Sequence, residues 1–166
     1  MISAETVTRV LESMSTMSDA QAQAIVTQMG KRQPEVLAYL LATSENEAFD
    51  QDERQVFFYI GMVIWQIMKQ HPNGRDRITE TQLERAEKAN EDLLEKMASD
   101  SSGDFSSATQ SMIENYPEPE VLRYLTQALM EDEEGNPDNP PIRDENLGLA
   151  FLSLKIVLDA FIGKTT

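Results

Sequence analysis

The sequence predicts an all-α protein of about eight helices, and three observations lead to this fold class. Hydrophobic residues recur at the three- and four-residue spacing of amphipathic helices, and helix-capping residues precede most of these stretches. The second half of the chain also repeats the order of the first. Apolar residues make up 40% of the 166 residues and charged residues 26%, which is typical of a chain that folds around a core.

Three helices are expected before residue 45. Ser3 is placed to cap the first, and Ser18 the second, with Gln21 at the spacing of a capping box. Gly30 is expected to end the second helix, because glycine is preferred just beyond a helix C-terminus. Pro34 suits the first turn of the third helix, where its missing N–H has no cost.

The fourth helix is expected to begin near Asp50 or Asp52 and to end at about His71, before Pro72. Residues 56–68 within it are apolar on nearly all sides, as in a central helix that others surround. This run is shorter than the roughly 20 residues that span a bilayer. It therefore predicts a buried core helix, and no contact with a membrane is expected.

The second half is expected to contribute four more helices. Thr79 begins a capping box for the fifth, an apolar stripe from Phe105 marks the sixth, and Pro119 opens the seventh. The last helix is expected over about 144–162, ended by Gly163. Its charged residues are few, so it too is interpreted as a buried helix.

Three pairs of segments recur in the same order in the two halves. In the longest pair, six of eight positions are identical. The pairs are 33–40 with 118–125, 10–14 with 93–97, and 52–53 with 144–145. Three matches in a constant order predict an internal duplication.

We therefore expect residues 1–74 and 75–166 to form two four-helix units that share one core. Their long last helices would meet at a pseudo-twofold axis within a compact bundle. The unit length is also close to two helical hairpins of about 40 residues, so a stack of the HEAT or armadillo kind is the alternative. The chain lacks the signature residues of the named repeat families.

The net charge of −15 is unevenly distributed. Residues 1–74 hold nine acids and five bases, or −4, and residues 75–166 hold twenty acids and nine bases, or −11. Such a surface repels nucleic acid and anionic lipids, so neither is expected as a direct partner, whereas a basic protein is favoured. Solubility alone is the simpler explanation of the acidity.

An acidic, proline-containing loop over 131–141 is the main difference between the two halves. It fails the EF-hand pattern, because Pro141 would occupy the twelfth position, which requires a carboxylate. Insertions in repeats often contact partners. Tyr39 and Tyr124, which are equivalent in the repeat, are candidates for a shared groove, although packing of their rings is the simpler interpretation. The candidate partner-contact residues are Glu131, Asp132, Glu133, Glu134, Asp138, Tyr39 and Tyr124.

No catalytic, cofactor-binding or metal-binding residue is assigned. The absence of cysteine excludes thiolate ligands, disulfides and cysteine nucleophiles. His71 is the one histidine, and no orienting acid or nucleophile accompanies it in the sequence. Acidic residues after Thr79, such as Glu87 and Glu91, are interpreted as a solvated helix face with Lys88 as an i, i+4 partner.

The leading hypothesis is a non-enzymatic protein-interaction module, a regulator or adaptor, that presents an acidic surface to a basic protein. One alternative is an acidic antagonist that mimics nucleic acid and acts on a nucleic-acid-binding protein. Another is a small-molecule or metal-dependent helical enzyme with a pocket between the two units. A cytoplasmic location is expected, since cysteine and a secretory signal are both absent, and a monomer or homodimer is expected.

Overall fold

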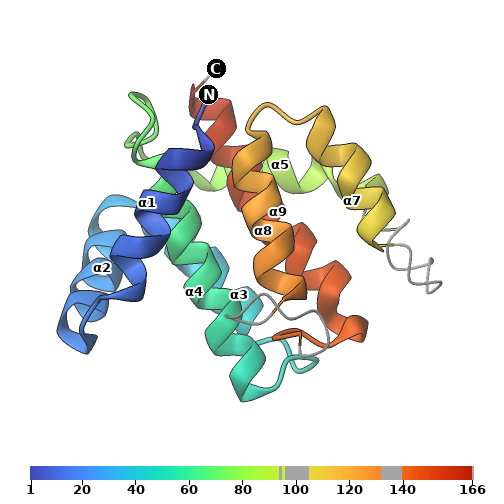
Figure 1. Ribbon diagram of the computed structural model, residues 1–166, viewed down its shortest axis with the longest axis horizontal. Helices are drawn as coiled ribbons and strands as arrows, with labels where there is room; N and C mark the ends of the chain where they lie inside the picture. The colour runs from blue at the N-terminus through green and yellow to red at the C-terminus, as the bar shows by residue number, and fades with distance from the viewer. Residues whose placement is uncertain (94, 96–104, 132–139, 166) are drawn as a thin grey trace.

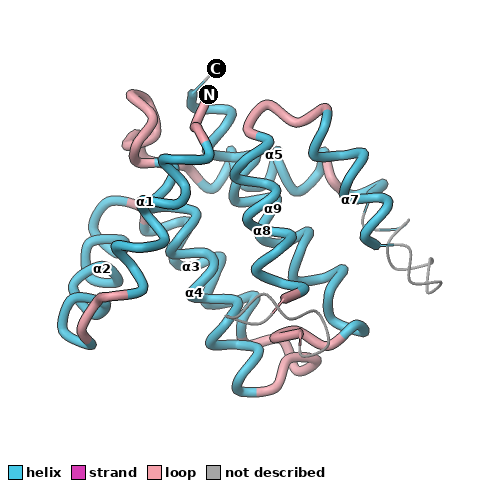
Figure 2. The backbone as a smooth tube through the Cα atoms, viewed as in Figure 1, coloured by secondary structure: helices cyan, strands magenta, loops and turns pink. Residues whose placement is uncertain are grey.

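The computed structural model describes residues 1–93, 95, 105–131 and 140–165, without the side chains of 105–108, 164 and 165. Every regular element in these ranges is an α-helix, so the all-α prediction is confirmed (Figure 2). The helices are α1 (Ala4–Ser15), α2 (Asp19–Arg32), α3 (Pro34–Ser44), α4 (Gln51–Met68), α5 (Glu80–Ala89), α7 (Phe105–Glu114), α8 (Pro119–Met130) and α9 (Asp144–Thr165).

The helix starts follow the predicted capping chemistry. Ser3 accepts a hydrogen bond from the N–H of Thr6, and Ser18, Asp50 and Thr79 each form a complete capping box. Proline occupies the first turn of α3 and of α8. These positions satisfy or remove N–H groups that have no partner within a helix.

Three predicted helix ends are wrong. α2 continues through Gly30 to Arg32, and α9 continues through Gly163 to its end at Thr165. In both places a glycine sits within the last turns, where intact helical hydrogen bonding outweighs its propensity cost of about 1 kcal/mol. α4 ends at Met68 rather than near His71, because the chain turns tightly there: Gly74 passes so close that a Cβ on it would lie 1.7 Å from the carbonyl oxygen of Met68.

Helices α4 and α9 form the centre of the molecule, as expected from their apolar sequences (Figure 1). α4 packs against α1, α3, α8 and α9, while α9 also packs against α5 and α8. Gly61 of α4 allows a close approach of α3, because a Cβ there would lie 2.7 Å from Leu40. The fully buried side chains of α4 are Phe57, Ile60, Val63, Ile64, Trp65, Ile67 and Met68.

α9 is also the one helix in the described part of the chain that is long and apolar enough to cross a membrane, judged by length and composition alone. Within the protein, 78% of this stretch, Asp144–Gly163, is buried. Its apolar surface is thus covered by α4, α5 and α8. A buried core helix satisfies the same length and composition criteria as a membrane span.

Two buried side chains just before α3 and α8 connect segments that are far apart in the sequence. The side chain of Gln33 accepts a hydrogen bond from the N–H of Ile78 (2.8 Å), and Glu118 accepts one from the N–H of Ile2 (2.8 Å). Both side chains are almost completely buried. The start of α5 is thereby fixed beside α3, and the start of α1 beside α8.

The N-termini of α4 and α9 meet at a buried carboxylate. Glu53 accepts hydrogen bonds from the guanidinium group of Arg143 (2.7 Å) and from the amide of Asn146 (3.1 Å). Burial alone would raise the pKa of Glu53, but bonds from Arg143, the N–H of Asp50 and Asn146 outweigh it and lower the pKa to about 2. The carboxylate is therefore charged and fully bonded where the two central helices begin.

Candidate functional site

Helix α5 and the residues just after it carry a row of exposed carboxylates. Glu80, Glu84 and Glu87 follow one another at i, i+4 and i+7 of α5, Glu91 comes just beyond the helix end at Ala89, and all four are exposed. A helix rises about 1.5 Å per residue, so the part of the row on α5, from Glu80 to Glu87, is about 10 Å long. Leu83 and Ala86 of the same helix are buried against the core.

These carboxylates have no ionic partner within the described residues. Lys88, which the sequence suggested as their i, i+4 partner, forms no ion pair with them. The four negative charges therefore face solvent without neutralisation, and we call Glu80, Glu84, Glu87 and Glu91 the α5 acidic row. An exposed row of like charges raises the local potential and attracts cations.

A second group of charged residues lies inside the molecule, where α5 and α9 meet the connection before α8. The ammonium group of Lys155 contacts Asn90 Oδ1 (2.7 Å) and Asp159 Oδ2 (2.8 Å). Asn90 also donates to Asp159 (2.9 Å), and the hydroxyl group of Tyr116 donates to the other oxygen of Asp159. We call Lys155, Asp159, Asn90 and Tyr116 the α9 polar cluster.

The contacts within the α9 polar cluster satisfy its own members. Burial raises the pKa of Tyr116, and the negative charge of Asp159 raises it further, so the phenol remains a donor. The Lys155 ammonium also lies 5.6 Å from the centre of the Tyr116 ring, within cation–π range. A paired cation, a paired anion and a neutral phenol join three segments here, which is a structural role.

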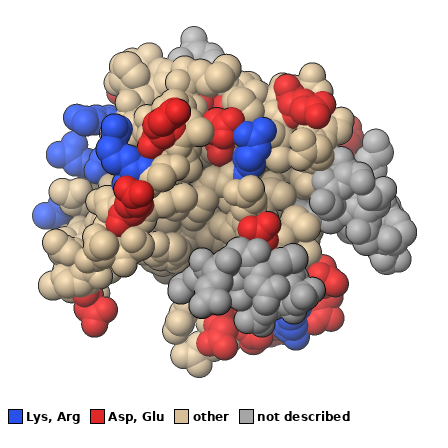
Figure 3. Space-filling model, viewed as in Figure 1, with Lys and Arg blue, Asp and Glu red and all other residues tan. Residues whose placement is uncertain are grey.

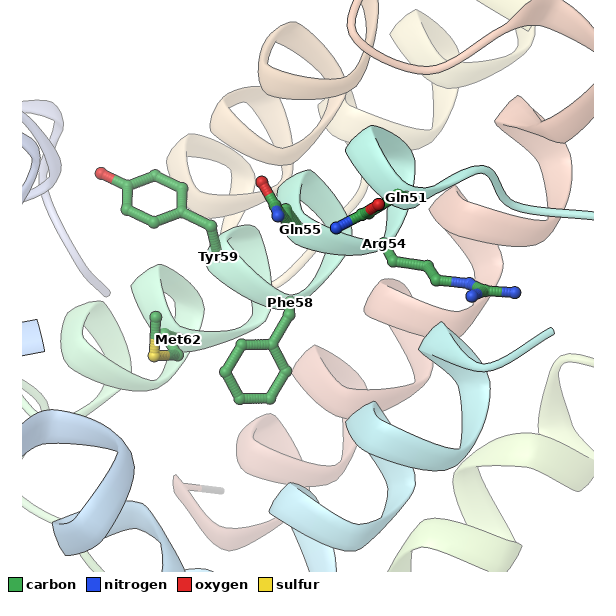
Figure 4. Close-up of a pocket in the computed structure, with 6 residues that line it drawn as sticks. All are labelled: Gln51, Arg54, Gln55, Phe58, Tyr59 and Met62. Carbon is green, nitrogen blue, oxygen red and sulfur yellow. The ribbon is translucent and has the colours of Figure 1, made fainter. Parts of the chain in front are cut away.

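A shallow surface pocket of about 410 Å³ is open to solvent along α4. All six side chains that line it come from this one helix. The side chains of Phe58 and Tyr59 project from the α4 backbone in different directions (Figure 4). Tyr59 is 38% exposed, which is unusual for a large aromatic residue on a central helix. The lining residues are Gln51, Arg54, Gln55, Phe58, Tyr59 and Met62.

The two tyrosines from the repeat contact different helices. Burial raises the pKa of Tyr39, while hydrogen bonds with Ser153 of α9 and with Thr43 act in the opposite direction. Burial also raises the pKa of Tyr124, as does its proximity to Tyr59 of α4. Both rings are half-buried, and the two side chains are not brought together by these contacts.

The structure describes one residue of the predicted acidic contact loop. Glu131 is half-buried and caps the end of α8, with its N–H bonded to the carbonyl of Gln127 (2.9 Å). The other four candidates, Asp132, Glu133, Glu134 and Asp138, lie outside the described residues. Among the residues that are described, no group of three or more His, Asp or Glu side chains is placed to bind a metal ion.

Glu80 and Glu84 were not predicted as site residues, although the signal was present in the sequence. Their spacing to Glu87 follows one helical stripe, and the buried Leu83 and Ala86 mark the side of the helix that packs on the core. The α9 polar cluster had a weaker signal, since Lys155 and Asp159 are an i, i+4 pair in an otherwise apolar helix. Nothing in the sequence connects them to Asn90 or Tyr116.

Comparison of the chain with protein-family models, with curated proteins and with solved structures finds no match.

Proposed function

We propose that this protein is a non-enzymatic interaction module that presents the α5 acidic row to a basic segment of a partner protein. The observation that carries the proposal is the row itself: three exposed carboxylates on one stripe of α5 and a fourth just after it, none of them in an ion pair within the described residues. Neutralisation of such charges by Lys or Arg from a partner is favourable, and the net charge of −15 increases the association rate with cations.

The internal charged groups support a binding function rather than a catalytic one. Lys155 and Asp159 neutralise each other, and Glu53 is fully engaged by Arg143 and Asn146. A general acid or base needs a side chain that is free to exchange a proton with a substrate. Among the described residues, the charged side chains that form no ion pair are exposed or half-buried.

Two synthetic helical peptides of identical composition test the proposal. One carries Lys at i, i+4 and i+7, so that its charges match the spacing of Glu80, Glu84 and Glu87 on α5, and the other carries the same lysines dispersed around the helix. We expect the matched peptide to bind the full chain several-fold more tightly in fluorescence anisotropy, and the difference to shrink with added salt. Equal binding of both peptides would refute a specific role for the row.

A matched pair of variants locates the binding surface. Glu84→Gln/Glu87→Gln/Glu91→Gln and the control Glu12→Gln/Glu45→Gln/Glu47→Gln both change the formal net charge from −15 to −12, and all six positions are exposed. We expect the first to weaken binding of the matched peptide about 5- to 10-fold at low salt, and the control by less than 2-fold. Similar losses in both would mean that only net charge matters.

The second candidate function is that of an acidic antagonist that occupies the nucleic-acid site of another protein. The observation that favours it is again linear order, because regularly spaced negative charges resemble a phosphate backbone more than scattered ones do. A lysine-rich peptide bound to labelled duplex DNA provides the test. The full chain is expected to displace the DNA, and the triple α5 variant to do so less well; failure to compete at excess chain would exclude this function.

We also propose that residues 1–74 and 75–166 are copies of one four-helix unit related by a pseudo-twofold axis. Two hydrogen bonds between the halves support this, because they join corresponding positions. The N–H of Ile78, just before α5, bonds to the side chain of Gln33, just before α3. The N–H of Ile2, just before α1, bonds to the side chain of Glu118, just before α8. α3 on α4 and α8 on α9 are a corresponding pair of helix contacts. A structural superposition of the halves would refute the duplication if the four helices did not align in order.

A further inference from the structure

Basic side chains gather where α2 and α4 end. Lys31 and Arg32 are in the last turn of α2, Lys69 follows the last residue of α4, and Arg75 lies in the loop after it. On the face seen in Figure 3, Lys and Arg atoms lie together on the side occupied by α2 and this loop. We call Arg32, Lys69 and Arg75 the basic cluster.

Hydrogen bonds join the backbone segments that carry the three cations. The side-chain NH₂ group of Gln33 donates a hydrogen bond to the backbone carbonyl of Asp76 (2.8 Å). The side-chain oxygen of Gln33 accepts one from the backbone N–H of Ile78 (2.8 Å). Arg32 and Arg75 immediately precede Gln33 and Asp76, so the first of these bonds brings them to neighbouring positions. Gln33 is fully buried, which makes the junction part of the core rather than a loose surface contact.

Lys69 is fixed to the same junction from its other side. Its ammonium group lies 4.7 Å from the centre of the Trp65 ring, and its carbonyl accepts a bond from Nε of Arg75 (3.4 Å). The close passage of Gly74 by Met68 keeps the intervening turn tight. Three cations from three segments are therefore positioned by contacts that do not neutralise their charge.

No carboxylate in the described part of the chain forms an ion pair with Arg32, Lys69 or Arg75. The nearby Arg77 is bonded to Glu35 (3.5 Å). The chain has 29 acids and 14 bases, so unselected placement would put acids, not bases, beside a lysine. Burial lowers the pKa of Lys69, and the charges of Arg75 and Arg32 lower it further, consistent with uncompensated repulsion.

We propose that the basic cluster is a binding site for a compact, multiply charged anion of the phosphate class. Three cations match a phosphate dianion or monoester better than a single carboxylate, and the guanidinium fork binds phosphate oxygens in pairs. Extended polyanions are disfavoured, because the rest of a chain of net charge −15 repels them. The ligand is therefore a small phosphate-bearing molecule or a single phosphorylated side chain.

The test is a titration of the full chain with inorganic phosphate and pyrophosphate, followed by NMR shifts of the backbone amides at constant ionic strength. Chloride at the same ionic strength is the reference. We expect saturable shifts confined to residues around 31–35 and 69–78, with pyrophosphate binding more tightly. Shifts that are equal in chloride, or that spread along the chain without saturation, would overturn the site.

Variants of equal charge change separate the site from general electrostatics. Arg32→Gln/Arg75→Gln is expected to weaken pyrophosphate binding at least 10-fold. Arg54→Gln/Arg85→Gln is the control, since both arginines are exposed and form no ion pair among the described residues, and Arg54 lies at the opposite end of α4. Circular dichroism reports whether each variant remains folded, and Arg32→Lys/Arg75→Lys, which retains charge and fold, is expected to keep part of the binding.

Three further measurements assign the source of the anion and separate anion binding from a helix-dipole effect and from self-association. Glycerol phosphate and a phosphoserine peptide distinguish a free metabolite from a phosphorylated side chain, and tighter binding of either supports the site. If the cluster only complements the helix dipoles, the double Gln variant lowers the melting temperature but leaves the phosphate-induced shift intact. Sedimentation that reveals self-association, lost in the same variant, would instead mean that a second copy occupies the cluster.

Discussion

The α9 polar cluster and the basic cluster both contain positive charge, but they differ in whether that charge is paired with a carboxylate. Inside the molecule, Lys155 meets a carboxylate, an amide and an aromatic ring within one set of contacts. At the ends of α2 and α4, Arg32, Lys69 and Arg75 are brought together without a carboxylate partner among the described residues. Specific contacts hold the side chains in place in both clusters, so the two clusters differ in whether the positive charge has a carboxylate partner.

The difference follows from the cost of leaving a charge unpaired. A buried cation without a partner loses its hydration and destabilises the fold by several kcal/mol, so α9 requires Asp159 near Lys155. An exposed cation keeps most of its hydration and costs little, which leaves it available to an external anion. The same reasoning applies to negative charges. The buried carboxylate of Glu53 is paired, whereas the exposed carboxylates of the α5 acidic row are not.

The largest effect is expected from Lys155→Met. The methionine fills a similar volume, but Asp159 then remains largely buried with its charge unpaired, since its side chain is 22% exposed. We expect a loss of about 3 kcal/mol in the free energy of unfolding, measured by urea denaturation. Lys88→Met, at an exposed position of α5, should change stability by less than about 0.5 kcal/mol.

The double variant Lys155→Met/Asp159→Leu sharpens this prediction. If the unpaired charge is the cause, removal of both charges should cost clearly less than the single lysine replacement, because no ion is left in the interior. Additive losses would instead show that the two side chains contribute through packing alone, and the distinction between paired and unpaired charge would not hold at this site.

The next effect depends on pH and concerns Glu53. Its pKa is about 2 in the folded protein against 4.5 for the free group, so its contribution to stability is complete above pH 4.5 and is lost as the pH falls towards 2. We expect Glu53→Gln to cost about 2 kcal/mol at pH 6, because a carboxylate that accepts bonds from Arg143 and Asn146 is replaced by a neutral amide.

The stability difference between the native chain and Glu53→Gln, followed from pH 6 to pH 2.5, provides the measurement. It should shrink steadily below about pH 4.5, as the native carboxylate gains a proton and loses its advantage over the amide. The exposed Glu47 provides a control, since Glu47→Gln should show little dependence over the same range. A constant difference for Glu53→Gln would contradict the low pKa.

A smaller effect compares the two buried side chains before α3 and α8. Gln33→Glu keeps the acceptor for Ile78 but places a second oxygen against the carbonyl of Asp76, so a loss of about 1–3 kcal/mol is expected. Glu118→Gln keeps the acceptor for Ile2 and loses only the terminal ammonium group, 4.0 Å away and largely exposed, so less than about 1 kcal/mol is expected. Equal losses in thermal unfolding would contradict this difference.

Much of the fold was predictable because its signals are local. Ser18 and Gln21 specify a capping box within four residues, and the apolar stretch of α4 can only be covered by surrounding helices. The ends of α2 and α9 were predicted wrongly, because glycine is a weak stop signal when the following residues continue the hydrogen bonding. Helix ends depend on what the next segment contacts, and that is not local.

The charged sites required information that the sequence does not contain. Arg32 and Arg75 are 43 positions apart and become neighbours through one bond between Gln33 and Asp76. Similarly, Asn90 and Asp159 meet across 69 positions. Among these charged sites, only the part of the α5 acidic row from Glu80 to Glu87 could have been found from the sequence, because its spacing follows a single helix. Contacts between distant segments depend on packing, which periodicity does not specify.

The smallest effect is expected where charge is exposed and unpaired. Glu84→Gln/Glu87→Gln/Glu91→Gln should leave the free energy of unfolding within about 0.5 kcal/mol of the native value. Removal of the repulsion between Glu84 and Glu87, which are one turn apart on α5, should even add a few tenths of a kcal/mol. Urea denaturation at low and high salt measures the overall change in the free energy of unfolding and the part of it that comes from relieved repulsion, since only the repulsion responds to salt. A loss above about 1.5 kcal/mol would mean that the row stabilises the fold, and weaker peptide binding by this variant could then not be assigned to lost contacts with a partner.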